Sequence, residues 1–291
     1  MADGRTLFTA LARGEPPPRP LFLPLVEGLA ARVAGADPAA LEADPDLCAR
    51  AVRQATSLVG GDALCFGFEA AYEADDERFA RFTDTLKRAF EPARGSLGCV
   101  VALPGPATLA RRLSGRADKE VPDKEALDAV RPVLTRMAEA VCQTRPDLLV
   151  FLEDAEARSV PVDGTLKRAY AAARKVAAYY DAATAVHVGG WEDAAEEARR
   201  LAPLGLDFLW LGAGGGVDPA ALAAALGEGS WRGAVLPLPL DDPQAAAALA
   251  GAARQAAGGP LLALSSAGPL APSADLERII ETKTALGALH R

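Results

Sequence analysis

The sequence predicts an α/β fold, a single (β/α)₈ barrel with an N-terminal helical addition. Short apolar runs of strand length alternate eight times with segments of helical periodicity, which indicates a parallel sheet covered by helices. The runs are apolar almost throughout, as is typical of strands buried on both faces. The chain has 291 residues, a length that one barrel can fill, so we expect one domain over residues 1–291.

The eight expected strands are apolar runs separated by helical segments. They begin within residues 21–25, 63–66, 99–103, 148–152, 184–187, 208–211, 234–238 and 261–264. Pro24 and Pro237 lie inside the first and seventh runs, and a proline removes one donor from a strand ladder. These prolines therefore affect where the two strands end, but not the alternation.

Several helices carry a capping acid directly before a proline suited to the first turn. These pairs are Asp44-Pro45, Asp218-Pro219 and Asp242-Pro243. Asp123 begins another helical run, and the segment 192–200 places its acids before Arg199 and Arg200, which complements the helix dipole. The residues before Leu21 and a helical hairpin at 37–58 are additions to the barrel.

Charge and cysteine content narrow the classes of partner. The formal net charge is −8 and no cluster of Lys and Arg forms a stripe, so nucleic acid is not an expected partner. No apolar run reaches the roughly 18–20 residues that cross a bilayer, and the first residues lack a signal-peptide pattern. The four widely spaced cysteines are expected to be reduced thiols. We expect a cytoplasmic protein that acts on a small molecule, away from membranes.

The candidate site residues follow the expected strands at their carboxyl ends, where the active sites of such barrels lie. We assign catalytic roles to four of them, namely Glu69, His187, Glu153 and Asp154. We assign substrate binding to Glu27, Ser265 and Ser266. Acids that converge in a partly dry cleft push each other's pKa values apart, which suits acid–base chemistry.

Each candidate also has a structural interpretation. Glu69 could be a solvated loop acid or the partner of an arginine, and Glu153-Asp154 could cap the segment that follows. His187 ends an apolar strand, where a histidine can be purely structural. The glycine-rich run 212–216 lacks the context of a phosphate-binding loop, so we interpret it as a turn.

Four short stretches, in order, resemble the uroporphyrinogen decarboxylase superfamily, which includes zinc methyltransferases acting on corrinoids and is related to cobalamin-independent methionine synthase. They are Arg19-Pro20-Leu21-Phe22, Gly60-Gly61-Asp62-Ala63 leading to Gly67-Phe68-Glu69, Gly105-Pro106-Ala107-Thr108-Leu109, and Val186-His187-Val188-Gly189-Gly190. The resemblance covers nearly the full length. It implies a barrel enzyme, and a homodimer would be usual for the family.

The chain departs from both branches of this superfamily. The decarboxylases carry substrate-gripping arginines just after the first strand, whereas residues 25–29 read Leu-Val-Glu-Gly-Leu, without a cation. The methyltransferases hold zinc with a His-x-Cys pair and a later cysteine. Here glycine follows His187-Val188, and Ser265-Ser266 stand in the late segment, so two thiolates are missing. We therefore expect no metal and no resident cofactor.

Three functions fit these observations. The first is a decarboxylase-like carbon–carbon lyase that acts by acid–base chemistry on a small carboxylated, non-porphyrin substrate, with Glu69 and His187 handling protons. The second is a zinc-independent methyltransferase or demethylase that uses a pterin or a partner corrinoid protein. The third is a non-catalytic binding protein on the same fold.

Overall fold

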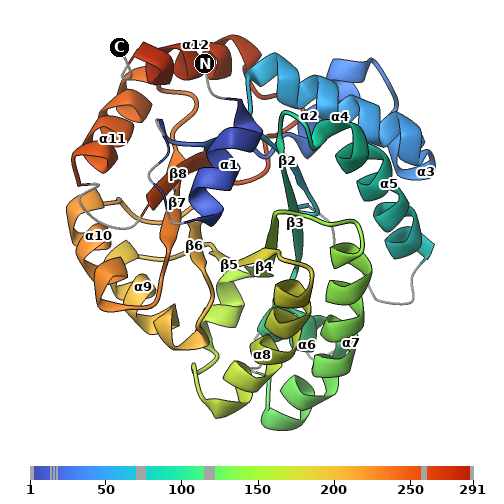
Figure 1. Cartoon of the computed structure of the whole chain (residues 1–291), viewed down its shortest axis with the longest axis vertical. Coiled ribbons are helices and arrows are strands. Elements are labelled where there is room, and N and C mark those ends of the chain that lie inside the picture. The colour runs from blue at the N-terminus through green and yellow to red at the C-terminus, as the bar shows by residue number, and fades with distance from the viewer. Residues whose placement is uncertain are drawn as a thin grey trace.

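The computed structural model of the chain describes residues 3–13, 15, 17, 19–69, 77–114, 122–256 and 261–288. Eight parallel strands run around the sheet in the order β1-β8-β7-β6-β5-β4-β3-β2, and helices surround them (Figure 1). The strands are β1 (Phe22–Leu23), β2 (Ala63–Phe66), β3 (Gly98–Pro104), β4 (Leu148–Glu153), β5 (Ala183–Val188), β6 (Phe208–Leu211), β7 (Gly233–Leu238) and β8 (Leu261–Ser266). The predicted barrel is confirmed, with each expected strand in its place.

The helices follow the strands in alternation, with one further helix before β1, two more between β1 and β2, and one more between β3 and β4. They are α1 (Gly4–Ala12), α2 (Glu27–Ala34), α3 (Pro38–Ala43), α4 (Pro45–Val59), α5 (Glu77–Ala93), α6 (Pro106–Ser114), α7 (Lys124–Cys142), α8 (Gly164–Tyr179), α9 (Ala194–Leu201), α10 (Pro219–Glu228), α11 (Pro243–Ala256) and α12 (Leu276–Ala288), with short 3₁₀ turns η1 (Ala155–Ser159) and η2 (Ala202–Leu204). The expected caps Asp44, Asp123 and Asp218 accept hydrogen bonds from the first turns of α4, α7 and α10. None of the helices in the described part of the chain is long and apolar enough to cross a membrane.

The two prolines have different effects on their strands. β1 ends at Leu23, directly before Pro24, and is much shorter than the apolar run that predicted it. Pro237 lies within β7 and pairs with Ser265 of β8. The ladder between β6 and β7 has already ended at Val235, so the donor that Pro237 lacks has no acceptor to leave unpaired on that side.

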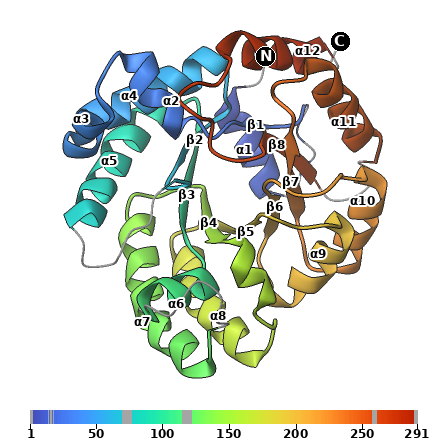
Figure 2. The same ribbon diagram turned by 180° about the vertical axis from the view of Figure 1, so that it is seen from behind.

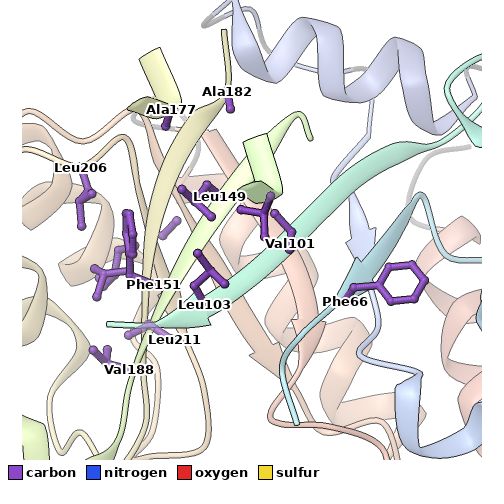
Figure 3. Close-up of a cluster of buried hydrophobic side chains, with 14 of the residues drawn as sticks. Phe66, Val101, Leu103, Leu149, Phe151, Ala177, Ala182, Val188, Leu206 and Leu211 are labelled. Atoms are coloured by element: carbon purple, nitrogen blue, oxygen red, sulfur yellow. The ribbon is translucent and has the colours of Figure 1, made fainter. Parts of the chain in front are cut away.

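Strand side chains alternate between two apolar layers, as the pleat requires. The outer layer lies between strands and helices, and Figure 3 shows Val101, Leu103, Leu149 and Phe151 projecting into it from β3 and β4. The inner layer fills the barrel and includes Val150, Ala185 and Trp210, among others. The parity of a residue along its strand therefore decides whether its side chain faces the helices or the barrel interior.

Helix α1 closes the barrel at the amino ends of its strands. Its apolar residues Leu7, Phe8 and Leu11 belong to the inner layer, and the backbone N–H of Arg5 donates to the carbonyl of Ser96, just before β3. Figures 1 and 2 show α1 across one end of the barrel, in front of the strands and then behind them. The opposite end, at the carboxyl termini of the strands, is left for a site.

Candidate functional site

Glu27 lies where β1 meets β2, at the carboxyl end of the barrel. Its Oε1 accepts from the backbone N–H of Gly67 at 2.9 Å, and its Oε2 accepts from the N–H of Phe68, also at 2.9 Å. Burial and the negative charge of Glu69 raise the pKa of Glu27 to about 7, although the backbone donors oppose that rise. The carboxyl group is thus poised to gain or lose a proton near neutral pH.

These contacts also seal the barrel. β1 and β2 stand at the two ends of the strand order, with no backbone ladder between them. At the amino end, Asp62 replaces the ladder: its Oδ2 accepts from the N–H of Phe22 at 2.8 Å, and Arg19 forms a two-pronged ion pair with it. At the carboxyl end, Glu27 does the same for Gly67 and Phe68. The N–H of Asp62 also donates to the carbonyl of Phe22 at 2.8 Å, so one backbone hydrogen bond and these side chains close what we call the β1–β2 seam.

Glu69 lies beside Glu27, and we call these two residues the carboxyl pair. A methyl group at Gly28 would come within 2.7 Å of Glu69 Oε1 and 2.4 Å of the Leu270 carbonyl, so only glycine leaves room for this carboxyl group. Loss of water around Glu69 raises its pKa as well, even though the side chain is exposed. The pair combines one anchored carboxyl group with one that can reach a ligand.

A cavity of about 580 Å³ adjoins the carboxyl pair, which is a typical size for a small-molecule site. Its walls come from β2 and helices α2 to α5, so the predicted helical addition forms part of the cavity. Three arginines, Arg32, Arg78 and Arg81, also line it. Arg32 donates to the carbonyls of Pro272 and Ala274, which ties α2 to the loop after β8. The cavity presents acids and cations side by side.

His187 faces the barrel interior from β5, next to Phe68 and Trp210. The ring centroids of Phe68 and His187 are 5.9 Å apart, and those of Phe68 and Trp210 are 5.0 Å apart. Burial lowers the pKa of His187 to about 4, so the imidazole is neutral at pH 7. Since the N–H of Phe68 binds Glu27, this residue joins the carboxyl pair to the histidine on one rim.

Glu153 takes a different direction from the one expected. It has the same parity as Leu149 and Phe151, so its side chain leaves the strand toward the helices and not toward the interior. It accepts from Tyr170 Oη at 2.6 Å, Thr108 Oγ1 at 2.7 Å, Thr108 N at 2.8 Å and Ala107 N at 3.2 Å. These donors occupy both oxygens and cap α6, so Glu153 lies outside the shared cavity that the sequence predicted.

Asp154 is also engaged in local structure. Its Oδ1 accepts from the N–H of Ala157 at 2.9 Å and caps η1, while its Oδ2 pairs with Arg111 at 2.7 Å. The two serines join β1 to β8: Ser265 Oγ donates to the carbonyl of Leu23 at 2.7 Å, and Ser266 Oγ accepts from the N–H of Leu25 at 3.0 Å. All three polar groups are satisfied by the protein itself.

The structure thus brings together Glu27, Glu69 and His187, and separates Glu153 and Asp154 from them. Three features of the site were missed in the sequence. Trp210 lies in an apolar run that gave no functional signal, Phe68 was noted only as part of the stretch that carries the resemblance, and Arg78 and Arg81 come from a helix without a motif. Gly28 was seen at the end of the first strand, but its role in leaving room for Glu69 was not, although glycine in the first turn of a helix often marks a close approach.

The described residues do not fit a zinc ion of the kind that the resemblance implies. Among them, no group of three or more His, Cys, Asp or Glu side chains has the arrangement of a metal site. Cys65, Cys99 and Cys142 are buried, and burial raises the pKa of each thiol, which disfavours the thiolate form that binds a metal.

No protein-family model and no curated protein matches this sequence. The fold is similar to that of a methyltransferase from Methanosarcina mazei, with a TM-score of 0.75 and 15% identity over 100% of both chains. It is also similar to a B12-independent methionine synthase from Shewanella sp. W3-18-1, solved with selenomethionine, with a TM-score of 0.60 and 14% identity over 94% of this chain and 95% of that one. A Listeria monocytogenes protein described as a B12-independent methionine synthase matches with a TM-score of 0.55 and 13% identity, over 93% and 96%. At these identities the likeness establishes the fold alone.

Proposed function

We propose that this chain is an enzyme of methyl transfer or demethylation that needs no protein-bound zinc, a divergent relative of the corrinoid and pterin methyltransferase barrels. Its reacting groups are the carboxyl pair and its methyl carrier is a pterin or a partner corrinoid protein. The observation that carries the proposal is the carboxyl pair beside a cavity of about 580 Å³. The end-to-end similarity to a methyltransferase barrel supports this reaction over the decarboxylation that the sequence favoured.

The chemistry of the carboxyl pair suits this reaction. A methyl group leaves a nitrogen or oxygen atom more easily when that atom gains a proton as the carbon–heteroatom bond breaks, so the enzyme needs an acid near neutral pH. Glu69, with a raised pKa and an exposed side chain, is the group that can donate this proton. Glu27 is held by the backbone of the β1–β2 seam and keeps a second exchangeable proton next to it.

The N-termini of helices α9 to α12 disfavour a phosphorylated substrate. Barrels often bind phosphate at helix N-termini on this face, near the last strands. Here α9, α10, α11 and α12 begin at their own capping aspartates, Asp193, Asp218, Asp242 and Asp275, which accept from the first-turn N–H groups. A phosphate would have to displace a carboxylate at each of these ends.

Binding and turnover measurements on the purified protein test the proposal. We expect calorimetric titration to detect a reduced folate or a cobalamin, and methyl transfer to fall by about 10²–10⁴-fold in Glu69→Gln. Glu42→Gln is the matched control, because Glu42 lines the same cavity but is paired with Arg78 and does not belong to the carboxyl pair. Full turnover by Glu69→Gln would contradict the role of Glu69, and no binding of either carrier would remove methyl transfer.

The three arginines of the cavity favour a second candidate, the small-substrate decarboxylase. Guanidinium groups hold carboxylates through paired hydrogen bonds, and here they come from α2 and α5 instead of the segment where the decarboxylases carry them. Incubation with small carboxylated heteroaromatic acids and an assay for released CO₂ separates the two reactions. If neither carrier binding nor CO₂ release is found, the non-catalytic binding protein becomes the better explanation.

A further inference from the structure

Two buried polar atoms in the barrel interior have no hydrogen-bond partner among the described residues. They are Nε2 of His187 and Nε1 of Trp210, which lie on paired positions of β5 and β6. The other two tryptophans are satisfied: the Nε1 of Trp191 donates to the carbonyl of Gly212 at 3.0 Å, and that of Trp231 to the carbonyl of Ala198 at 3.0 Å. A buried indole N–H without an acceptor is costly, so its persistence here points to a ligand or a water molecule.

The two atoms offer complementary chemistry. An indole Nε1 can only donate a hydrogen bond. The backbone of His187 itself raises the pKa of the ring against the effect of burial, and since Nε2 has no partner, we assign the ring proton to Nδ1. A neutral imidazole that donates through Nδ1 has a bare Nε2, which accepts. The ring centroids are 6.4 Å apart, so the two rings are neighbours in the barrel interior.

We propose that His187 Nε2 and Trp210 Nε1 form an acceptor–donor subsite in the mouth of the barrel that binds one hydroxyl group of an uncharged aromatic ligand, with a water molecule taking its place in the free protein. A hydroxyl oxygen donates to His187 and accepts from Trp210 at once. A carboxylate cannot donate to Nε2, and an ammonium group cannot accept from the indole. The subsite therefore selects against both charges.

The surroundings determine the rest of the ligand. Phe68 lies against both rings and is partly exposed, as are His187 and Leu152, whereas Trp210 is fully buried. Aromatic rings pack well edge to face or offset, so this mouth suits a flat ring that carries the hydroxyl. Gly212 leaves room for the imidazole edge, since a methyl group there would approach Nε2 to 2.7 Å.

This inference deepens the proposed function by naming a hydroxyl-bearing aromatic ring as the methyl acceptor or the demethylated product, and that assignment rests on the proposed function. The binding itself does not require methyl transfer. Phenol binding without turnover would leave the subsite in place and remove the reaction, whereas turnover with a carrier but no phenol binding would do the reverse.

The experiment follows the indole and imidazole signals of ¹⁵N-labelled protein by NMR during titration with phenol, benzoate and toluene. The chain has three tryptophans and two histidines, so Trp210→Phe and His187→Gln assign the signals. We expect phenol to shift the Trp210 indole and the His187 Nε2 signals, and to bind at least about tenfold more tightly than benzoate or toluene. The Trp191 and Trp231 indoles, which already have acceptors, stay in place.

Variants sharpen the result. Trp210→Phe should weaken phenol binding by about tenfold, and Gly212→Ala should block access to Nε2 with a similar loss. Trp231→Phe is the matched control, because that indole bonds a carbonyl outside the barrel interior, and phenol should bind it as it binds the parent protein. An unshifted Trp210 signal, or benzoate binding as tight as phenol binding in the parent protein, would overturn the proposal whether or not the variants fold.

Discussion

The rim after β1 and β2 and the rim after β4 both carry acids directly behind a strand, yet the protein uses these acids differently. After β4, Glu153 accepts four hydrogen bonds, and both of its carboxylate oxygens are used to bind α6 and α8. After β1 and β2, Glu27 is held by backbone donors on one side, and Glu69 remains exposed beside a cavity. All of these residues are glutamates, and the number of hydrogen-bond donors nearby decides whether the carboxylate is structural or available to a ligand.

The largest effect that separates the two regions should be on stability. Replacing Glu153 with alanine leaves Tyr170 Oη and Thr108 Oγ1 without their buried acceptor, so we expect a loss of ~3–5 kcal/mol in the free energy of unfolding. Denaturant unfolding followed by circular dichroism measures this loss. Glu156→Ala, an exposed acid in the next turn, should change stability by less than about 0.5 kcal/mol. A similarly small loss of stability in Glu153→Ala would contradict the structural role that distinguishes Glu153 from the acids after β1 and β2.

The second prediction concerns the pH dependence of stability at Glu27. Its pKa is raised from 4.5 to about 7 in the folded state, so the folded protein binds this proton more tightly than the unfolded chain does. The resulting stabilisation is complete below pH 4.5 and is lost as the pH rises through 7, amounting to at most about 3 kcal/mol. Urea unfolding from pH 4.5 to 8 measures the difference in the free energy of unfolding between the parent protein and Glu27→Gln. The stability of the parent protein relative to the variant should fall as the pH rises through 7. A flat difference would contradict the raised pKa.

His187 should show the opposite sign over an overlapping pH range. Its pKa is lowered from 6.5 to about 4, so the folded protein disfavours the proton. The corresponding stability is present above pH 6.5 and is lost as the pH falls toward 4, again by at most about 3 kcal/mol. Comparison of His187→Gln with the parent protein over that range checks it, and NMR titration of the ring gives the pKa directly. A measured pKa near 6.5 would mean that the His187 ring is exposed to water, and would contradict its burial in the barrel.

The smallest effect is expected where the barrel uses hydroxyl groups. Ser265→Ala removes one buried hydrogen bond to the carbonyl of Leu23, which should cost about 1 kcal/mol without changing ligand binding. Thermal unfolding together with calorimetric titration of the bound carrier measures both properties. A large loss of binding with normal stability would return Ser265 to the site, where the sequence had assigned it.

The sequence was sufficient for the barrel and much less so for the site. Alternation of apolar runs predicted every strand, because burial of both faces leaves a simple pattern. Which way an acid points after its strand depends on parity and on donors from distant segments, such as Tyr170 for Glu153, and neither is visible locally. The packing of α1 into the amino end of the barrel was also missed, because the apolar face of this helix differs little in sequence from that of a surface helix.

The β1–β2 seam has a consequence for how the molecule opens. Every other junction between neighbouring described strands is a backbone ladder, which breaks only when several hydrogen bonds fail together, whereas here a single backbone hydrogen bond and two carboxylates join the strands. Local unfolding begins where cooperative bonding is weakest, so amide hydrogen exchange should be fastest at this junction. Glu27 is one of the groups that close this seam. A ligand that binds Glu27 should therefore slow amide hydrogen exchange in both β1 and β2.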